Sequence, residues 1–191
     1  MSRWRPGARE RLVIAAVDLF SEQGYDATTV DQIAVRAGVT KSTFFRHFHD
    51  KRELLSAGQD TLSTLLMEGI RQAPSDAGPL AAVSAGLQRA STALGPAQQE
   101  LGPRIKAAIA SSVELQERAA LKNVGLAAAM TAALKDRGIA EPVAQLASEL
   151  GVLALKRGYA AWSEGGRQAG NDLAQHAKAA LEELRAASVA L

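Results

Sequence analysis

The sequence contains no cysteine and few aromatic residues, which make up 4% of its 191 positions. Without cysteine, disulfides and thiolate metal sites are excluded. The three histidines, His47, His49 and His176, form no spaced ligand set with acidic residues. We therefore expect neither a metal site nor a cofactor.

The chain also lacks long apolar runs free of charge. Neither a membrane span nor a signal-peptide core is recognisable, so a soluble cytoplasmic protein is expected. No serine–histidine–aspartate order, glycine-rich phosphate loop or cluster of metal ligands appears. We expect no catalytic residues and predict that the chain is not an enzyme.

The sequence does contain hydrophobic residues distributed as in helices. Hydrophobic residues make up 47% of the chain, in runs rich in alanine and leucine, and no turn-flanked alternation typical of strands occurs. We predict an all-α protein of about nine helices, with breaks at Gly95-Pro96 and Gly102-Pro103. The expected ranges are 8–23, 30–37, 41–47, 50–71, 80–94, 104–110, 113–137, 142–163 and 171–187.

The stretch from Thr29 to Phe48 predicts two short helices with a tight turn between them. Thr29 and Gln32 have the spacing of a capping box, and Gly38 suits the end of the first helix. Thr40 would cap the second helix, whose Phe44 and Phe48 point into a core. Its remaining face is short, polar and basic, as in the recognition helix of a helix-turn-helix.

Charge is distributed unevenly between the two parts of the chain. Residues 1–52 hold nine lysines or arginines against six acidic residues, and residues 53–191 hold thirteen against fourteen. Charge alone would fit an ordinary solvated surface. Combined with the helix-turn-helix pattern, the local basic excess favours contact with DNA.

At this point the chain resembles a known family. The stretch AVDLFSEQGYDATTVDQIAVRAGVTKSTFFRHFHDKRELL is similar to the DNA-binding domain of TetR-family regulators, although Phe45 replaces a usual tyrosine and His49 a usual proline or glycine. The resemblance implies a helix-turn-helix domain over 1–52 and a helical ligand-binding and dimerisation domain over 53–191. It implies a homodimeric transcription factor, most often a repressor, that binds a palindromic operator in double-stranded DNA and responds to a small molecule.

DNA contacts are expected from both short helices. Phosphate contacts are assigned to Thr29, Thr40, His47 and Lys51. Base-edge contacts are assigned to Lys41, Ser42 and Thr43, with Arg36 reaching from the preceding helix. Two interpretations of Phe45 remain open: contact with a thymine methyl or deoxyribose, or packing on its own helix.

The second domain offers weaker signals. A pocket lined by alanine, leucine, Met67 and Met130 would suit a largely aliphatic effector, with Tyr159 and Trp162 as the aromatics of that domain. Arg104 could receive an anionic end. Plain core and solvated surface are the competing interpretations. The stretch from Ser112 to Trp162 is loosely similar to regulators of the mycofactocin-regulator type, which suggests an acyl-CoA ligand.

Two further expectations concern assembly and switching. The resemblance implies a dimer interface from the last two long helices, whose apolar faces are formed by Val143, Leu146, Leu150, Leu153 and Leu155, and by Leu173, Ala177, Ala180, Leu181 and Leu184. A continuous helix 50–71 could act as a lever between the domains. The alternative function is an architectural or adaptor protein without a ligand, but the negative charge of 53–191 argues against an architectural role.

Overall fold

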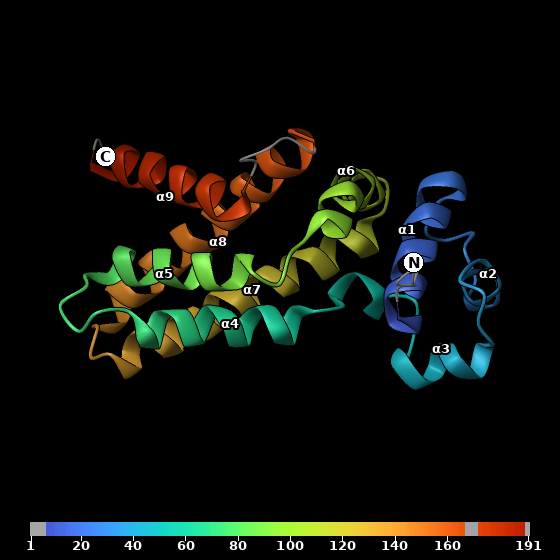
Figure 1. Ribbon diagram of the computed structural model, residues 1–191, viewed down its shortest axis with the longest axis horizontal. Coiled ribbons are helices and arrows are strands. Elements are labelled where there is room, and N and C mark those ends of the chain that lie inside the picture. The colour runs from blue at the N-terminus through green and yellow to red at the C-terminus, as the bar shows by residue number, and fades with distance from the viewer. Residues whose placement is uncertain (1–6, 167–171, 190–191) are drawn as a thin grey trace, which may run out of the picture. The chain divides into compact units, whose positions relative to one another are not determined.

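The computed structural model describes residues 7–166 and 172–189 (Figure 1). Regular structure in this part of the chain is entirely helical, which confirms the all-α prediction and the expected number of helices. The expected start of the last helix, Asn171, lies outside the described residues. The elements are α1 (Ala8–Gln23), α2 (Val30–Arg36), α3 (Lys41–His47), the 3₁₀-helix η1 (Glu53–Ser56), α4 (Gln59–Gln72), α5 (Pro79–Ser91), α6 (Pro96–Ala110), α7 (Val113–Asp136), α8 (Glu141–Glu164) and α9 (Leu173–Val189).

The chain divides into two compact units. Unit 1 comprises Met1–Ala57 and Pro103–Ala120, and unit 2 comprises Gly58–Gly102 and Leu121–Leu191. Helices α6 and α7 therefore contribute residues to both units. The boundary at residue 52 expected from the sequence is a functional division, and it stays a prediction.

Unit 1 has an aromatic core. Phe20, Phe44 and Phe48 are buried there, and Ala108 of α6 and Leu115 of α7 belong to the same apolar cluster. Tyr25 is 3% exposed and packs edge-on against Phe20, with ring centroids 5.1 Å apart. Tyr25 is therefore a packing residue of this unit.

The helix expected over residues 50–71 is broken. Asp50 accepts the backbone N–H of Glu53 at 3.0 Å, but the 3₁₀-helix that follows ends at Ser56. Gly58 then adopts the left-handed conformation, with φ +86°, before α4 begins. A residue with a Cβ would be strained there, so the glycine stops the helix. The prediction of one continuous lever helix is therefore wrong.

The break expected at Gly102-Pro103 is also wrong. Helix α6 begins at Pro96 and runs through Pro103 to Ala110. An interior proline removes one helical hydrogen bond. The turn before it is held by Gln99, whose side-chain amide donates to the carbonyls of Trp162 at 2.8 Å and Gly166 at 2.9 Å. These bonds help to keep the helix continuous despite the proline.

Unit 2 is held together by helices that approach closely. A Cβ added to Gly69 of α4 would lie 2.7 Å from the Cα of Gly86 on α5, and one added to Gly158 of α8 would lie 2.5 Å from the Cα of Ala177 on α9. Helices α4 and α5 run side by side in Figure 1. Glycine thus lets the backbones of these helices approach closely.

The apolar faces of the last two helices have different environments. Leu173, Ala177 and Leu181 of α9 are buried in the core of their own chain. On α8, by contrast, Val143 is 49%, Leu146 61% and Leu153 36% exposed. None of the helices in the described residues combines the length and apolar character of a membrane span.

Candidate nucleic-acid interface

Helices α2 and α3 are fixed at their starts by threonine caps. The Thr29 hydroxyl accepts the N–H of Gln32 at 3.3 Å, and the Gln32 side-chain oxygen accepts the N–H of Thr29 at 2.8 Å. The Thr40 hydroxyl accepts the N–H of Thr43 at 3.1 Å. Both predicted caps are confirmed, so the turn that presents α3 is set by residues within the motif.

The seven-residue helix α3 has one buried and one open face. Phe44 and Phe48, at its end, are buried as predicted, whereas Lys41, Ser42, Arg46 and His47 are exposed. Phe45 is 51% exposed, and its ring meets Phe44 edge-on at 5.3 Å. Phe45 therefore packs against Phe44 and is at the same time accessible to a partner.

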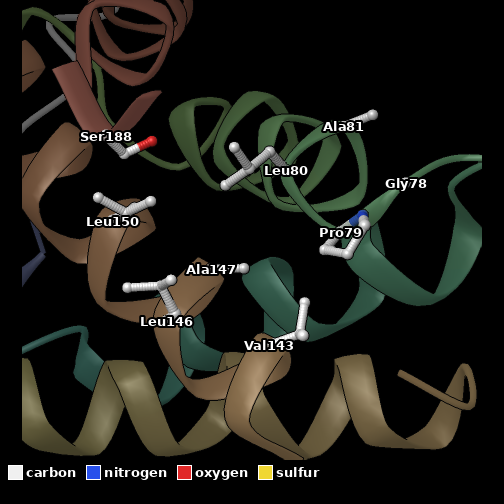
Figure 2. A pocket seen from close by; sticks show the side chains of 9 residues that line it. All are labelled: Gly78, Pro79, Leu80, Ala81, Val143, Leu146, Ala147, Leu150 and Ser188. Carbon is white, nitrogen blue, oxygen red and sulfur yellow. The ribbon is translucent and has the colours of Figure 1, made fainter. Parts of the chain in front are cut away.

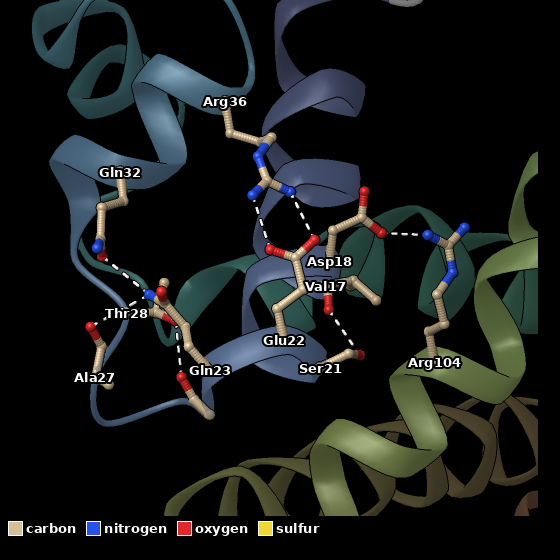
Figure 3. A network of polar contacts seen from close by, with 11 residues as sticks. Val17, Asp18, Ser21, Glu22, Gln23, Ala27, Thr28, Gln32, Arg36 and Arg104 are labelled. Carbon is tan, nitrogen blue, oxygen red and sulfur yellow. Dashed lines mark hydrogen bonds and ion pairs between the residues drawn. The ribbon is translucent and has the colours of Figure 1, made fainter.

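Two of the expected DNA-reading side chains are held by carboxylates. The Lys41 ammonium donates to Asp31 of α2 at 2.8 Å. The Arg36 guanidinium donates twice to Glu22 of α1, at 2.8 and 2.7 Å (Figure 3). This pairing lowers the pKa of the Glu22 carboxyl. Each cation is therefore oriented before any nucleic acid arrives.

Arg46 and His47 differ from these two. Neither side chain makes a hydrogen bond or ion pair with the part of the chain that the structure describes. The sequence-based assignment gave Arg46 no contact with DNA. Its exposure and free guanidinium make it a candidate for a phosphate, since arginine matches phosphate geometry with two parallel donors.

Lys51 is engaged inside unit 1. Its ammonium donates to the carbonyls of Tyr25 at 2.7 Å and Thr28 at 3.0 Å and lies 3.4 Å from that of Asp26. It also sits 4.1 Å from the centroid of the Tyr25 ring. A lysine has three donor hydrogens. A phosphate contact by Lys51 would therefore require at least one of these bonds to break.

A polar network surrounds the turn between α1 and α2. The Gln23 amide donates to Ala27, Thr28 and Gln32 (Figure 3). The Tyr25 hydroxyl donates to Glu114 of α7 at 3.1 Å, and Arg104 of α6 donates to Asp18 of α1. The turn is thus tied to the segment Pro103–Ala120 of the same unit.

The residues assigned to the effector pocket fall into two groups. Arg104 belongs to unit 1, where Asp18 engages it. The other four belong to unit 2. Met130 is fully buried in its core, Met67 packs against that core, and the rings of Tyr159 and Trp162 lie 5.7 Å apart. Burial raises the pKa of Tyr159 to about 12, and its hydroxyl donates to the carbonyl of Gln98 at 2.7 Å.

A separate apolar groove of about 350 Å³ lies on unit 2 (Figure 2). It is formed by the start of α5, the exposed side of α8 and Ser188 near the end of α9. None of the residues assigned to the pocket lines it. The lining residues are Gly78, Pro79, Leu80, Ala81, Val143, Leu146, Ala147, Leu150 and Ser188.

Comparison with known families gives a match for the helix-turn-helix. The model of bacterial regulatory proteins of the tetR family matches residues 12–57, which include most of α1 and all of α2 and α3. Residues 12–57 therefore form a DNA-binding domain of the TetR type. Its Thr29 and Thr40 caps and the exposed face of α3 are thus parts of a TetR-family DNA-binding domain.

Curated relatives match this chain over limited lengths. It is 42% identical over 69 residues to the HTH-type transcriptional activator FasR of Mycolicibacterium smegmatis, covering 36% of this chain and 32% of FasR. It is 37% identical over 76 residues to the HTH-type transcriptional regulator TcmR of Streptomyces glaucescens, covering 40% and 34%. The chain thus spans about a third of the length of these relatives.

Solved structures match over nearly the whole chain. Salmonella enterica GusR has a TM-score of 0.56 at 20% identity and covers 93% of this chain and 94% of its own. Bacillus subtilis FadR, solved with stearoyl-CoA, has a TM-score of 0.56 at 19% identity and covers 90% and 95%. At these identities the likeness concerns the fold alone.

Proposed function

We propose that this chain is a DNA-binding transcriptional regulator that binds a palindromic operator as a homodimer and is released by a small, mostly apolar effector. The observation that carries DNA binding is the capped helix-turn-helix with its open α3 face. Ser42, Arg46 and His47 present donors there, and Lys41 stands at the start of the same helix. A face of this kind enters the major groove in helix-turn-helix proteins.

The homodimer is supported by the exposed side of α8. Val143, Leu146, Leu150 and Leu153 follow one another at intervals of three and four residues, so they form one apolar stripe. Exposed apolar patches of this kind mark interaction surfaces. The apolar residues of α9 belong to the core of their own chain. The dimer proposal therefore rests on the α8 stripe and not on Leu181.

The effector is proposed from the composition of unit 2. Its core is lined by leucine, alanine, Met67 and Met130, which suits an aliphatic ligand better than a flat aromatic one. Bacillus subtilis FadR and Thermus thermophilus FadR were solved with stearoyl-CoA and lauroyl-CoA. Those ligands belong to those proteins, and at 19% and 21% identity the acyl class is a proposal for this chain.

Selection from a randomised DNA pool tests the function directly. Full-length protein should enrich a palindromic duplex whose half-sites are about 34–36 Å apart, one helical turn. Sedimentation of the complex should give two chains per site. Enrichment of no sequence over the starting pool would rule out a specific regulator and favour an architectural or adaptor protein.

The selected duplex then serves to test the effector. Titrating the protein–DNA complex with a fatty-acid and acyl-CoA panel should release DNA if the aliphatic proposal is right. Coupling of about 1–3 kcal/mol would weaken DNA binding about 5- to 150-fold, and DNA should weaken effector binding equally. Release by polar aromatic compounds alone would replace the aliphatic class. Transcription from a reporter that carries the duplex would distinguish repression from activation.

A further inference from the structure

The side chain at the start of the recognition helix is not free. Lys41 is the first residue of α3, and its ammonium lies 2.8 Å from an Asp31 carboxylate oxygen in the first turn of α2. Both side chains are more than half exposed, at 56% and 63%. A surface ion pair of this kind is weak, about 1 kcal/mol or less, so it does little for stability.

The pair instead restricts the direction in which the Lys41 ammonium points. An unpaired lysine on a DNA-binding face is a flexible point charge that any nearby phosphate can attract. Asp31 accepts one of the three hydrogens of the Lys41 ammonium, and the other two remain for another acceptor. Guanine presents two such acceptors, O6 and N7, on its major-groove edge.

A carboxylate on this surface has a second effect. It repels phosphates, so it weakens binding to DNA of any sequence. A protein that keeps the carboxylate next to its recognition helix loses non-specific affinity. What it gains is a cation that is directed toward bases and away from the backbone.

We infer that Asp31 is a specificity-determining positioning residue, which orients the Lys41 ammonium toward a guanine in each half-site. This inference rests on the proposed DNA-binding function. Asp31 itself makes no base contact in this account and acts through Lys41. The Glu22–Arg36 pair joins α1 to α2, shares no residue with the Asp31–Lys41 pair and is not needed for this inference.

The test compares base preference and not affinity alone. Wild-type protein is first used to select a duplex from a randomised pool, and every single-base variant of that duplex is then measured. Asp31→Asn should lose about fivefold or more of the preference for guanine at one position in each half-site. Binding to a scrambled duplex should become tighter at the same salt concentration. Asp31→Glu should restore most of the preference.

Asp26→Asn is the matched control. Asp26 is an exposed aspartate in the α1–α2 turn, so this change removes the same charge away from α3. It should leave the preference at every position unchanged. Thermal unfolding of each variant checks that the fold is intact, as expected for exposed carboxylates.

A double-mutant cycle separates positioning from direct reading. If Asp31 acts through Lys41, then Asp31→Asn should have no further effect on base preference in a Lys41→Ala background. Additive effects would mean that Asp31 reads a base itself and would overturn the inference. An unchanged preference profile in Asp31→Asn would overturn it too. If wild-type protein selected no duplex at all, the proposed function would fail first.

Discussion

The two units of this chain are stabilised by different kinds of interaction. In unit 1, side chains bind backbone groups: Thr29 and Thr40 cap helices, and Lys51 joins three carbonyls of one turn. In unit 2, backbones approach one another at glycine, as where Gly158 meets Ala177. The first kind of interaction depends on specific polar groups at specific positions, whereas the second depends on volume.

This difference explains which part of the chain can be recognised. A cap needs threonine, serine, aspartate or asparagine at one position, so the motif keeps its residue types. A helix–helix contact can be rebuilt with many combinations of small and large apolar residues. The family model ends at residue 57, where the first segment of unit 1 also ends. The recognisable motif thus covers the segment in which threonine caps fix the helix starts.

The largest effect is expected when a buried leucine and an exposed leucine of unit 2 are each replaced by glutamate. Leu181→Glu places a charge at a position that is 2% exposed, so the free energy of unfolding should fall by about 3–5 kcal/mol. Leu146→Glu changes a leucine that is 61% exposed and should leave the fold intact. If the α8 stripe is the dimer interface, Leu146→Glu should sediment as a folded monomer and lose operator binding. A folded Leu146→Glu dimer would move the interface elsewhere.

A close contact between α8 and α9 in unit 2 should be almost as sensitive to substitution. Gly158→Ala puts a Cβ 2.5 Å from the Cα of Ala177, where only backbone can move away. We expect a loss of about 1–3 kcal/mol in the free energy of unfolding. Gly125→Ala is the control, because its Cβ would meet only the movable Gln59 amide. That variant should be neutral or slightly more stable in a denaturant titration. Equal losses would show that the glycine contact is not what holds α8 to α9.

The stability of unit 1 should depend on the Lys51 side chain. Lys51→Ala removes the cation that joins the carbonyls of Tyr25 and Thr28, so the free energy of unfolding should fall by about 1.5–3 kcal/mol. The salt dependence of DNA binding should stay close to that of wild type. Arg46→Ala should do the reverse, leaving stability unchanged and flattening the log–log salt slope by about one unit per contact. A flattened slope in Lys51→Ala would return the phosphate role to Lys51.

The sequence predicts local features of the fold correctly and misses features that depend on residues far apart in the chain. Thr29, Gln32 and Thr40 were predicted correctly, because a cap is decided by residues within four positions. The helix over 50–71 was extended across Gly58 because its apolar spacing continues on both sides of the break. A break was predicted at Gly102-Pro103, but helix α6 continues through Pro103. The bonds from Gln99 to Trp162 and Gly166 join residues more than sixty positions apart, so the local sequence pattern does not reveal them.

The candidate site shows the same limit. The outward face of α3 followed from the four-residue spacing of Phe44 and Phe48. The partners of its cations did not follow, because Asp31 and Lys41 are ten residues apart and meet only through the turn between two helices. The engagement of Lys51 with the α1–α2 turn likewise spans more than twenty positions.

The smallest expected effect concerns the two tyrosines of the chain, one in each unit. Burial raises the pKa of Tyr25, and the neighbouring Glu114 carboxylate raises it further, whereas burial alone raises that of Tyr159 to about 12. A pKa that is higher in the folded state favours the neutral hydroxyl. The resulting stability is therefore present below pH 10 and is lost as the pH rises further.

We expect the 295 nm absorbance of native protein to stay flat through pH 10, where exposed tyrosines ionise, and to rise only near pH 12 or on unfolding. Tyr25→Phe and Tyr159→Phe each leave one reporter. The remaining Tyr159 should titrate first, near pH 12, because no carboxylate is bonded to it. Tyr25 should titrate later, and Glu114→Gln should bring its transition to lower pH, since that change removes the carboxylate charge but keeps an acceptor for the hydroxyl. An unmoved Tyr25 transition in Glu114→Gln would mean that burial alone sets its pKa, as it does in unit 2.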